Sequence, residues 1–276
     1  MPRNRRLFCE INPTCYFISL QKEIAKRYLK NLLSKEKFAK TIKKEELPNI
    51  VFSQSLNMIK RAKSVDLTTQ ENKMVNIKLA CNKINGIIIR PGEVFSFWKT
   101  VGKTSAKNGY KNGRIIQKNR IILGTGGGLC NLANTTHLLV LHSPLQVIEF
   151  HNHSDALAPD EGKRIPFNTG TSVRYNHIDY RFKNNTDQDF QLLLWCEGEI
   201  LHAELRSERE FPYYYKLAEE NHHFKKKGDK YYRISEIYKE ISDKLTGNIL
   251  DRKLVLDNHS EVLYDYTLIP KDQIRE

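Results

Sequence analysis

The feature that most constrains this chain is a glycine run that leads directly into a strongly apolar segment. Gly126, Gly127 and Gly128 are followed within a few residues by the segment 131–142, which holds four leucines, an alanine and a valine. A helix with so little polar surface is stable only when it is covered on most sides. The segment therefore predicts a buried helix, which Ser143-Pro144 ends.

Alternating apolar and polar residues predict the strands that cover this helix. Residues 145–153 alternate, so that Glu149, His151 and His153 share one face. An antiparallel meander is expected over 171–206, with strands at 171–175, 178–182, 190–195 and 200–206. The fold class is therefore α+β: a helical N-terminal region, followed by a mixed domain in which the buried helix packs on a largely antiparallel sheet that includes 145–153 and 171–206.

Three regions are predicted along the chain. Residues 1–71 form a basic helical N-terminal region, residues 72–210 form the main domain, and residues 211–276 form a C-terminal extension. The local patterns predict helices at 51–61 and 72–83, strands at 87–89 and 93–98, a hairpin of 114–117 with 120–123, a polar linker at 221–230, and a tail hairpin of 254–256 with 262–266.

The positive charge is concentrated at the N-terminal end. The chain has a formal net charge of +13, and residues 1–45 carry twelve basic and four acidic side chains. Apolar residues recur at helical spacing over 19–44, which predicts an amphipathic helix or two helices, docked by Leu20, Ile24 and Leu32 with the lysines in water. A membrane-surface or nucleic-acid patch is the less favoured alternative. The net positive charge predicts an anionic partner. No helix-turn-helix or RNA-recognition signature appears, so a sequence-specific nucleic-acid partner is not expected.

The cysteine spacing and the length of the apolar runs indicate the cellular compartment of the protein. The five cysteines have no paired spacing and no CxxC motif, which is typical of free thiols in a reducing compartment. No apolar run approaches the ~18–20 residues of a membrane-spanning helix. The basic start of the chain is followed by Glu10, Asn12 and Pro13, which make a poor secretory signal. A cytoplasmic protein without a transmembrane segment is therefore expected.

Cys130 is the candidate nucleophile. It lies at the start of the buried helix, where the positive end of the helix dipole favours a thiolate, so a lowered pKa is predicted. His151 or His153 would act as the base, and Asp179 would orient the imidazole. His137 shares a helical stripe with Cys130 and is a second candidate partner, although packing is the favoured interpretation of that histidine. The alternative for Cys130 itself is a small buried hydrophobic residue.

Cofactor motifs are not found. The glycine run lacks the Gly-Lys-Ser/Thr of a phosphate loop, and no acidic residue completes a dinucleotide fingerprint. The His151-x-His153 pair with Cys130 could supply three zinc ligands, but the spacing implies no fourth. Neither a cofactor nor a metal is therefore expected.

Several motif blocks, in order, resemble the VanW domain family. They are Asn76-Ile77-Lys78-Leu79-Ala80, Ile84-Asn85-Gly86, Pro91-Gly92-Glu93-Val94-Phe95-Ser96-Phe97, Gly109-Tyr110, Gly126-Gly127-Gly128-Leu129-Cys130 with Thr135-Thr136, and the later blocks 149–154 and 179–186. The resemblance covers about residues 72–195 and implies a bacterial protein of glycopeptide resistance or cell-envelope biology, without supplying a mechanism. The chain departs from the family pattern at Asn131, where Gln is usual, and at Gly170-Thr171-Ser172, where many members have Asp-Ala-Thr.

Two functions from different classes follow. The first is a thiol-dependent hydrolase or acyl-transferase acting on peptidoglycan peptides or their precursors, with backbone N–H groups from Gly128 to Asn131 as the oxyanion hole. The second is a non-catalytic module that binds a cell-wall peptide or a partner protein. In both, the ligand loop comprises Gly126, Gly127, Gly128, Asn131 and Asn134. An enzyme needs the Cys130 sulfur within hydrogen-bond reach of a histidine nitrogen, whereas a binding module does not.

Overall fold

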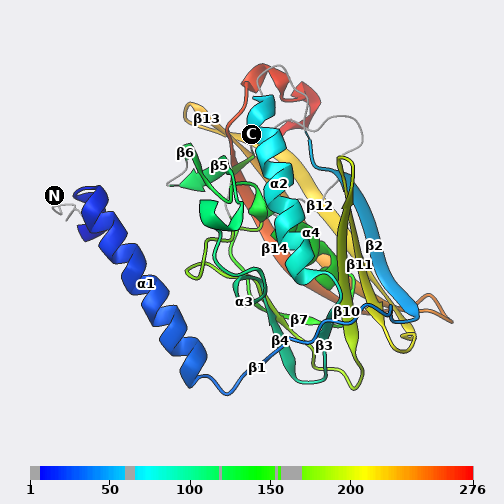
Figure 1. Cartoon of the computed structure of the whole chain (residues 1–276). Coiled ribbons are helices and arrows are strands. Elements are labelled where there is room, and N and C mark those ends of the chain that lie inside the picture. The colour runs from blue at the N-terminus through cyan, green and yellow to red at the C-terminus, as the bar shows by residue number, and fades with distance from the viewer. Residues whose placement is uncertain (1–6, 60–65, 118–119, 153–154, 157–169, 276) are drawn as a thin grey trace.

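In the part of the chain that the structure describes, the fold combines four α-helices with antiparallel-rich sheets, which confirms the α+β class (Figure 1). The computed structural model describes residues 7–59, 66–117, 120–152, 155–156 and 170–275. The α-helices of this part are α1 (Pro13–Leu33), α2 (Leu67–Ile84), α3 (Phe97–Val101) and α4 (Leu129–Leu141). Short 3-10 turns are η1 (Phe8–Glu10), η2 (Ala106–Asn108), η3 (Tyr266–Leu268) and η4 (Lys271–Gln273).

The central sheet has the order β2-β11-β10-β3 and is antiparallel throughout. Its strands are β2 (Asn49–Asn57), β3 (Ile87–Ile89), β10 (Phe190–Glu197) and β11 (Ile200–Ser207). β10 and β11 form a hairpin in which Phe190 pairs with Ser207 and Glu197 with Ile200. The two strands and their turn were expected from the sequence, and the structure confirms them.

Helices α2 and α4 form the layer that covers the central sheet (Figure 1). The packed faces contain fully buried Ile77 and Ala80 of α2, Leu132 and Leu139 of α4, and Leu192 of β10. Gly128 caps α4, and the helix ends near Ser143, as predicted. The prediction of a buried helix on an antiparallel sheet is therefore confirmed.

A second sheet has the order β1-β4-β9-β7 and corrects the predicted strand arrangement. Its strands are β1 (Lys37–Phe38), β4 (Glu93–Ser96), β7 (Gln146–Glu149) and β9 (Arg181–Lys183). β7 and β9 were expected beside β10 and β11, but β9 pairs with β7 and β4 instead. Residues 171–178 form only isolated β-bridges, one between Thr171 and Asn152 and one between Arg174 and Ile178. The predicted four-strand meander is therefore divided between two sheets.

The predicted helix at 51–61 is wrong, because this segment forms β2. Phe52, Gln54 and Leu56 are partly buried on one side of the strand, while Ser53 and Ser55 are exposed on the other. This period of two fits a strand, and β11 supplies the backbone partners for it. Residues 60 and 61 of the predicted helix lie outside the described residues.

Several segments in the first half of the main domain follow the sequence more closely. The expected helix at 72–83 is the larger part of α2, and the expected hairpin is formed by β5 (Asn112–Gln117) and β6 (Arg120–Thr125). The strand expected at 93–98 ends earlier, at Ser96. Its hydroxyl accepts the Lys99 backbone N–H at 3.3 Å, and this capping bond starts α3.

Helix α1 is shorter than the predicted helical stretch of 19–44. Asn12 caps its start by accepting the Cys15 N–H at 2.8 Å, and Pro13 occupies the first helical position. After the helix ends at Leu33, the chain enters β1, which pairs in parallel with β4. α1 buries none of its residues, so it lies against the rest of the protein and not within it.

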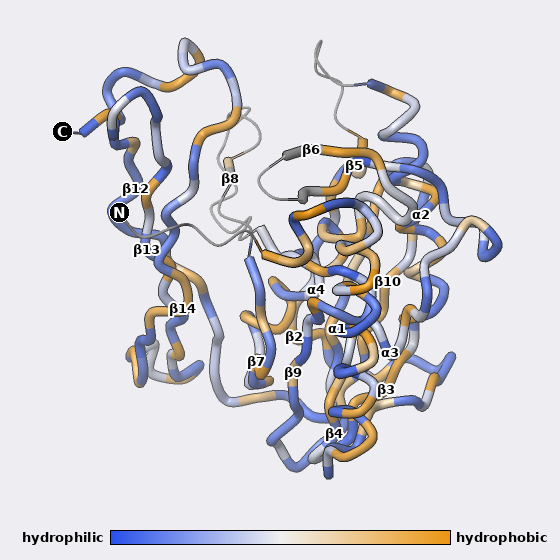
Figure 2. The backbone as a smooth tube through the Cα atoms, turned by 90° about the vertical axis from the view of Figure 1, so that its left-hand side faces the viewer, coloured by the Kyte–Doolittle hydropathy of each residue, from blue (hydrophilic) through white to orange (hydrophobic). Residues whose placement is uncertain are grey.

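The C-terminal region is a sheet of long strands in the order β15-β12-β13-β14-β8 (Figure 2). Its strands are β8 (Asp155–Ala156), β12 (Tyr213–Lys227), β13 (Lys230–Asp243), β14 (Ile249–Val262) and β15 (Ile274–Arg275). The predicted polar linker at 221–230 is wrong, since it forms the end of β12, its turn and the start of β13. The predicted tail hairpin is wrong as well: residues 254–260 continue one strand, in which Asp257 and Asn258 pair with β13.

Candidate functional site

The three glycines of the predicted ligand loop are required by close packing. Gly126 and Gly128 adopt φ of 81° and 96°, which glycine tolerates best. A Cβ on Gly127 would overlap the backbone of Gly113, and a Cβ on Gly128 would overlap the side chain of Lys73. Asn76 donates to the Gly127 carbonyl at 2.9 Å. The glycine run therefore lies tightly between α2 and β5.

The Cys130 thiol makes a backbone contact in this structure. It is the second residue of α4, is partly buried, and donates to the Val173 carbonyl at 3.7 Å. Burial raises the pKa of Cys130 above its ordinary value, although the Val173 contact and the charge of Arg174 act in the opposite direction. The sequence predicts a lowered pKa, so the direction of that expectation is wrong.

The asparagines of the predicted ligand loop face the interior. Asn134 is buried, and its side-chain oxygen accepts the Thr171 hydroxyl at 3.2 Å. The side-chain oxygen of Asn131 is also buried, and it has no hydrogen-bond partner in the described part of the chain. Asn134 therefore ties α4 to the loop that contains Thr171.

His151, a predicted base for Cys130, and Asp179, the predicted orienting group, both have other contacts in the structure. His151 is exposed and lies with its Nε2 atom 3.2 Å from Glu149 Oε1. His153 lies outside the described residues. The buried carboxylate of Asp179 accepts the Ser96 hydroxyl at 2.6 Å, Arg181 Nε at 2.7 Å, and the backbone N–H groups of Tyr180 and Trp98 at 2.9 and 3.1 Å. The carboxylate beside His151 is thus Glu149, and Asp179 holds the start of α3 and β9.

His137 is a packing residue, as the favoured interpretation predicted. Its ring stacks on Phe150 with centroids 4.5 Å apart, and its Nδ1 atom lies 3.1 Å from the Tyr180 hydroxyl. Burial, with a smaller effect from the charge of Lys239, lowers the pKa of His137 to about 3. The imidazole is therefore neutral near pH 7.

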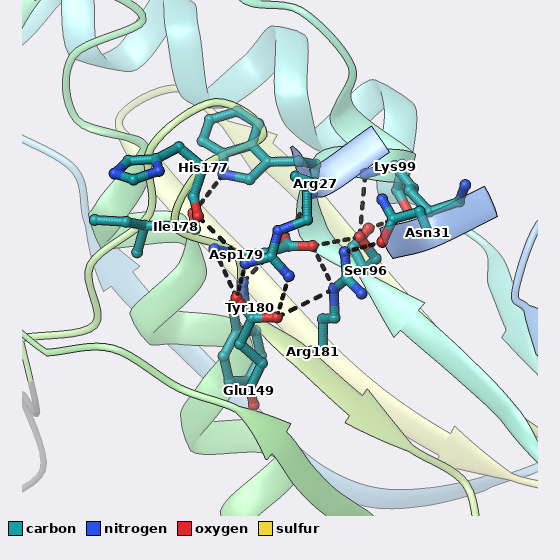
Figure 3. Close-up of polar contacts among 12 residues, drawn as sticks. Arg27, Asn31, Ser96, Lys99, Glu149, His177, Ile178, Asp179, Tyr180 and Arg181 are labelled. Carbon is teal, nitrogen blue, oxygen red and sulfur yellow. Dashed lines mark hydrogen bonds and ion pairs between the residues drawn. The ribbon is translucent and has the colours of Figure 1, made fainter. Parts of the chain in front are cut away.

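A cluster of charged side chains lies where α1 meets the second sheet, and Figure 3 shows them pointing toward one another. Arg27 of α1 binds Glu149 through both guanidinium nitrogens, at 2.7 and 2.6 Å. Arg181 donates to Asp179 and, at 2.8 Å, to Asn31 of α1. Burial would raise the pKa of Glu149, but the bond and charge of Arg27, together with His151 and Arg181, hold it below its ordinary value. The cluster joins two parts of the chain that are distant in sequence.

An open groove of about 910 Å³ lies beside this cluster, between the end of α1 and strands β1 and β4. Its lining is mixed: α1 contributes Tyr28, Leu29, Asn31 and Leu32, and the opposite side contributes Glu36, Lys37, Phe38, Lys40, Thr41, Arg90, Glu93 and Lys99. The groove was not predicted from the sequence. The basic and aromatic residues of 36–41 were its only local signal, and they were assigned to a helix.

The lining of the groove holds more basic than acidic side chains, and it includes the aromatic ring of Phe38. Lys99 Nζ lies 4.4 Å from the centroid of the Phe38 ring. Burial lowers the pKa of Lys99, and so do the charges of Lys40 and Arg181, while Asp179 acts in the other direction. Both acids of the groove have basic partners: Glu36 pairs with Lys183 at 3.3 Å and Glu93 with Arg90 at 3.9 Å. An anion near Lys40 and Lys99 would relieve their mutual repulsion.

Comparison with known proteins supports the motif analysis. The family model described as VanW like protein matches residues 72–206. The chain is similar to the Vancomycin B-type resistance protein VanW of Enterococcus faecalis, with 26% identity over 82% of each chain. It is also similar to the uncharacterized protein YoaR of Bacillus subtilis, with 28% identity over 44% of this chain and 38% of that one. No solved structure matches the chain.

Among the residues that the structure describes, no helix combines the length and the apolar character that crossing a bilayer requires.

Proposed function

Because this chain belongs to the VanW family, we propose that it acts in cell-envelope biology as a non-catalytic module that binds a cell-wall peptide or its precursor. The observation that carries the proposal is the groove between α1 and β1. It offers lysines for a carboxylate and apolar side chains for the aliphatic part of a peptide. Small ligands are commonly held by such a mixture of apolar surface and a few convergent polar groups.

Each part of the groove has a role in this proposal. Lys40 and Lys99 both line the groove, so a carboxylate bound there gains charge-assisted contacts with their ammonium groups. Phe38 and Leu29 supply the apolar surface against which alanine-like side chains pack. The ligand class is therefore a short peptide with a free C-terminal carboxylate.

The thiol-dependent hydrolase receives less support from the geometry. A nucleophilic cysteine needs a thiolate and a nearby base. The Cys130 thiol contacts the Val173 carbonyl and has a raised pKa, and Asp179 is engaged by four donors of its own. These contacts favour a structural role for both residues.

A cytoplasmic location is part of the proposal. All five cysteines are free, and the Cys81 and Cys196 sulfurs lie 4.0 Å apart without a bond. This state is typical of a reducing compartment. The peptide ligand would then be a precursor on the inner side of the cell membrane.

The test is calorimetric titration of the full chain with a synthetic cell-wall stem peptide. Its C-terminal amide serves as the matched control ligand. The free carboxylate is expected to bind, and Lys40→Gln with Lys99→Gln to weaken binding about tenfold or more, whereas Lys107→Gln, an exposed lysine of η2, leaves it unchanged. Equal binding of acid and amide, or equal affinities of the two variants, would overturn the proposal. Cleavage of the peptide that depends on Cys130 would favour the hydrolase instead.

A further inference from the structure

Helix α1 is attached to the rest of the protein through polar contacts along one side. In addition to Arg27 with Glu149, the Tyr28 and Tyr175 hydroxyls lie 2.9 Å apart, and Arg174 donates to the Tyr16 hydroxyl at 3.0 Å. Arg27 and Asn31, which are one turn apart, both reach the charged cluster. The opposite side of the helix therefore points away from the second sheet.

The apolar residues of α1 remain in solvent. Leu20 and Ile24 are half-buried on the side facing the protein, as the sequence predicted, but Leu32 is 81% exposed, so that part of the predicted docking face is wrong. The apolar side chains that are more than half exposed are Phe17, Ile18, Tyr28, Leu29, Leu32 and Leu33. Ile18, Leu29 and Leu32 are spaced by eleven and three residues and so lie on one face. Several exposed apolar side chains on one face of a helix mark an interaction site.

A row of lysines borders this apolar face. Lys22, Lys26 and Lys30 recur at four-residue intervals and are all exposed. Glu23 is the single acid of the helix, and Lys26 pairs with it at 2.8 Å. The outward side of α1 is thus both apolar and positively charged.

We propose that α1 is an interfacial helix, which lies on an anionic lipid surface with its apolar face among the headgroups. Lysines that flank an apolar face extend their ammonium groups toward anionic headgroups, while their methylene stems remain on the apolar side. A protein partner is less favoured, because the centre of a protein interface is depleted in lysine. The apolar face shares Leu29 and Leu32 with the groove, whereas Ile18, Leu33 and the three lysines do not line it, so variants of these five residues test the lipid proposal separately from the groove.

The test is co-sedimentation of the full chain with vesicles of phosphatidylglycerol and phosphatidylcholine, compared with vesicles of phosphatidylcholine alone. Binding to the anionic vesicles is expected. Replacing Lys22, Lys26 and Lys30 by Gln removes about one kcal/mol each, which predicts about a hundredfold weaker binding. Ile18→Gln with Leu33→Gln is expected to weaken it about tenfold or more.

The matched control is Leu245→Gln, which changes a 95% exposed leucine in the turn between β13 and β14. It is expected to bind as the unchanged chain does, and circular dichroism shows that each variant is folded. Equal binding to both vesicle types, no binding, or equal loss in Leu245→Gln would overturn the proposal. So would a vesicle-free dimer that Ile18→Gln with Leu33→Gln dissociates, since the face would then join two copies of the chain.

Discussion

Arg27 and Glu149 form a two-pronged ion pair across 122 residues of sequence, and this pair fixes helix α1 to strand β7. Their side chains are only 12% and 16% exposed, so each charge is largely removed from water. An ion pair of this kind matters to stability mainly because the loss of one partner would leave the other charge buried and uncompensated. It is therefore the contact on which the position of α1 depends most.

Arg27→Ala is expected to lower the free energy of unfolding by about 2–3 kcal/mol, because Glu149 loses its two-pronged ion pair in a partly buried place and keeps only longer contacts, among them those with Arg181 and His151. Amide hydrogen exchange should increase throughout α1. The control is Lys26→Ala, which removes the exposed pair with Glu23 and costs less than about 0.5 kcal/mol. Equal effects of the two variants in chemical denaturation would contradict this role of Arg27.

The buried His137 predicts how stability depends on pH. Its pKa is about 3 in the folded protein and close to 6.5 in the unfolded chain, so the unfolded chain binds more protons between these values. Stability is therefore lost as the pH falls from 6.5 toward 3, by up to about 1.4 kcal/mol per pH unit. His137→Leu should remove this part of the dependence in denaturation curves. A variant with the same slope as the unchanged chain would assign the dependence to other groups.

Cys130 is expected to react slowly with iodoacetamide near neutral pH, because burial raises its pKa. The rate should increase when the chain is unfolded in urea, and His151→Ala should leave it unchanged. Cys15, which is partly exposed near the start of α1, serves as the internal comparison. Mass spectrometry of labelled peptides gives the rate at each site. Early labelling of Cys130, with a pH midpoint below about 8.5, would instead support a catalytic thiol.

Gly127 is expected to tolerate no side chain. Gly127→Ala places a Cβ against the backbone of Gly113 and should cost about 2–4 kcal/mol of stability. Gly198→Ala, in the open turn between β10 and β11, meets no atom within 4 Å and pays only for its φ of 55°, about 1 kcal/mol. Thermal unfolding compares the two. If Gly127→Ala lowers the stability no more than Gly198→Ala does, close packing does not explain the glycine run, and a ligand-binding role is favoured instead.

The elements that the sequence predicted well are those with a strong local period. β11 alternates and buries one face, whereas the strongly apolar α4 and β10 are buried on nearly every side, so in all three the local pattern and the tertiary packing agree. The segment 51–61 and the tail were predicted wrongly because their structure depends on distant partners. Asn258 looks like a turn residue, yet it pairs with Ser235 in the ladder of β13 and β14.

The candidate site was also predicted only where local patterns determine the contacts, and not where distant partners do. Asp179 was singled out as the group that orients an imidazole, but in the structure its carboxylate accepts the hydroxyl of Ser96, which lies 83 residues away, and no local pattern shows that the two meet. Glu149 stands two residues before His151 and was placed on the same strand face, which agrees with their contact. Arg27 could not be assigned to the cluster, because helical spacing indicates which residues share a face and not which strand that face will meet.

The two walls of the groove differ in how they are held. The β1–β4 wall is a hydrogen-bonded part of a sheet, and its Phe38 pairs with Val94. The α1 wall contributes no buried residue and rests on side-chain contacts alone. A shift of α1 would therefore change the width of the groove without exposing any core side chain, because this helix buries none of its residues.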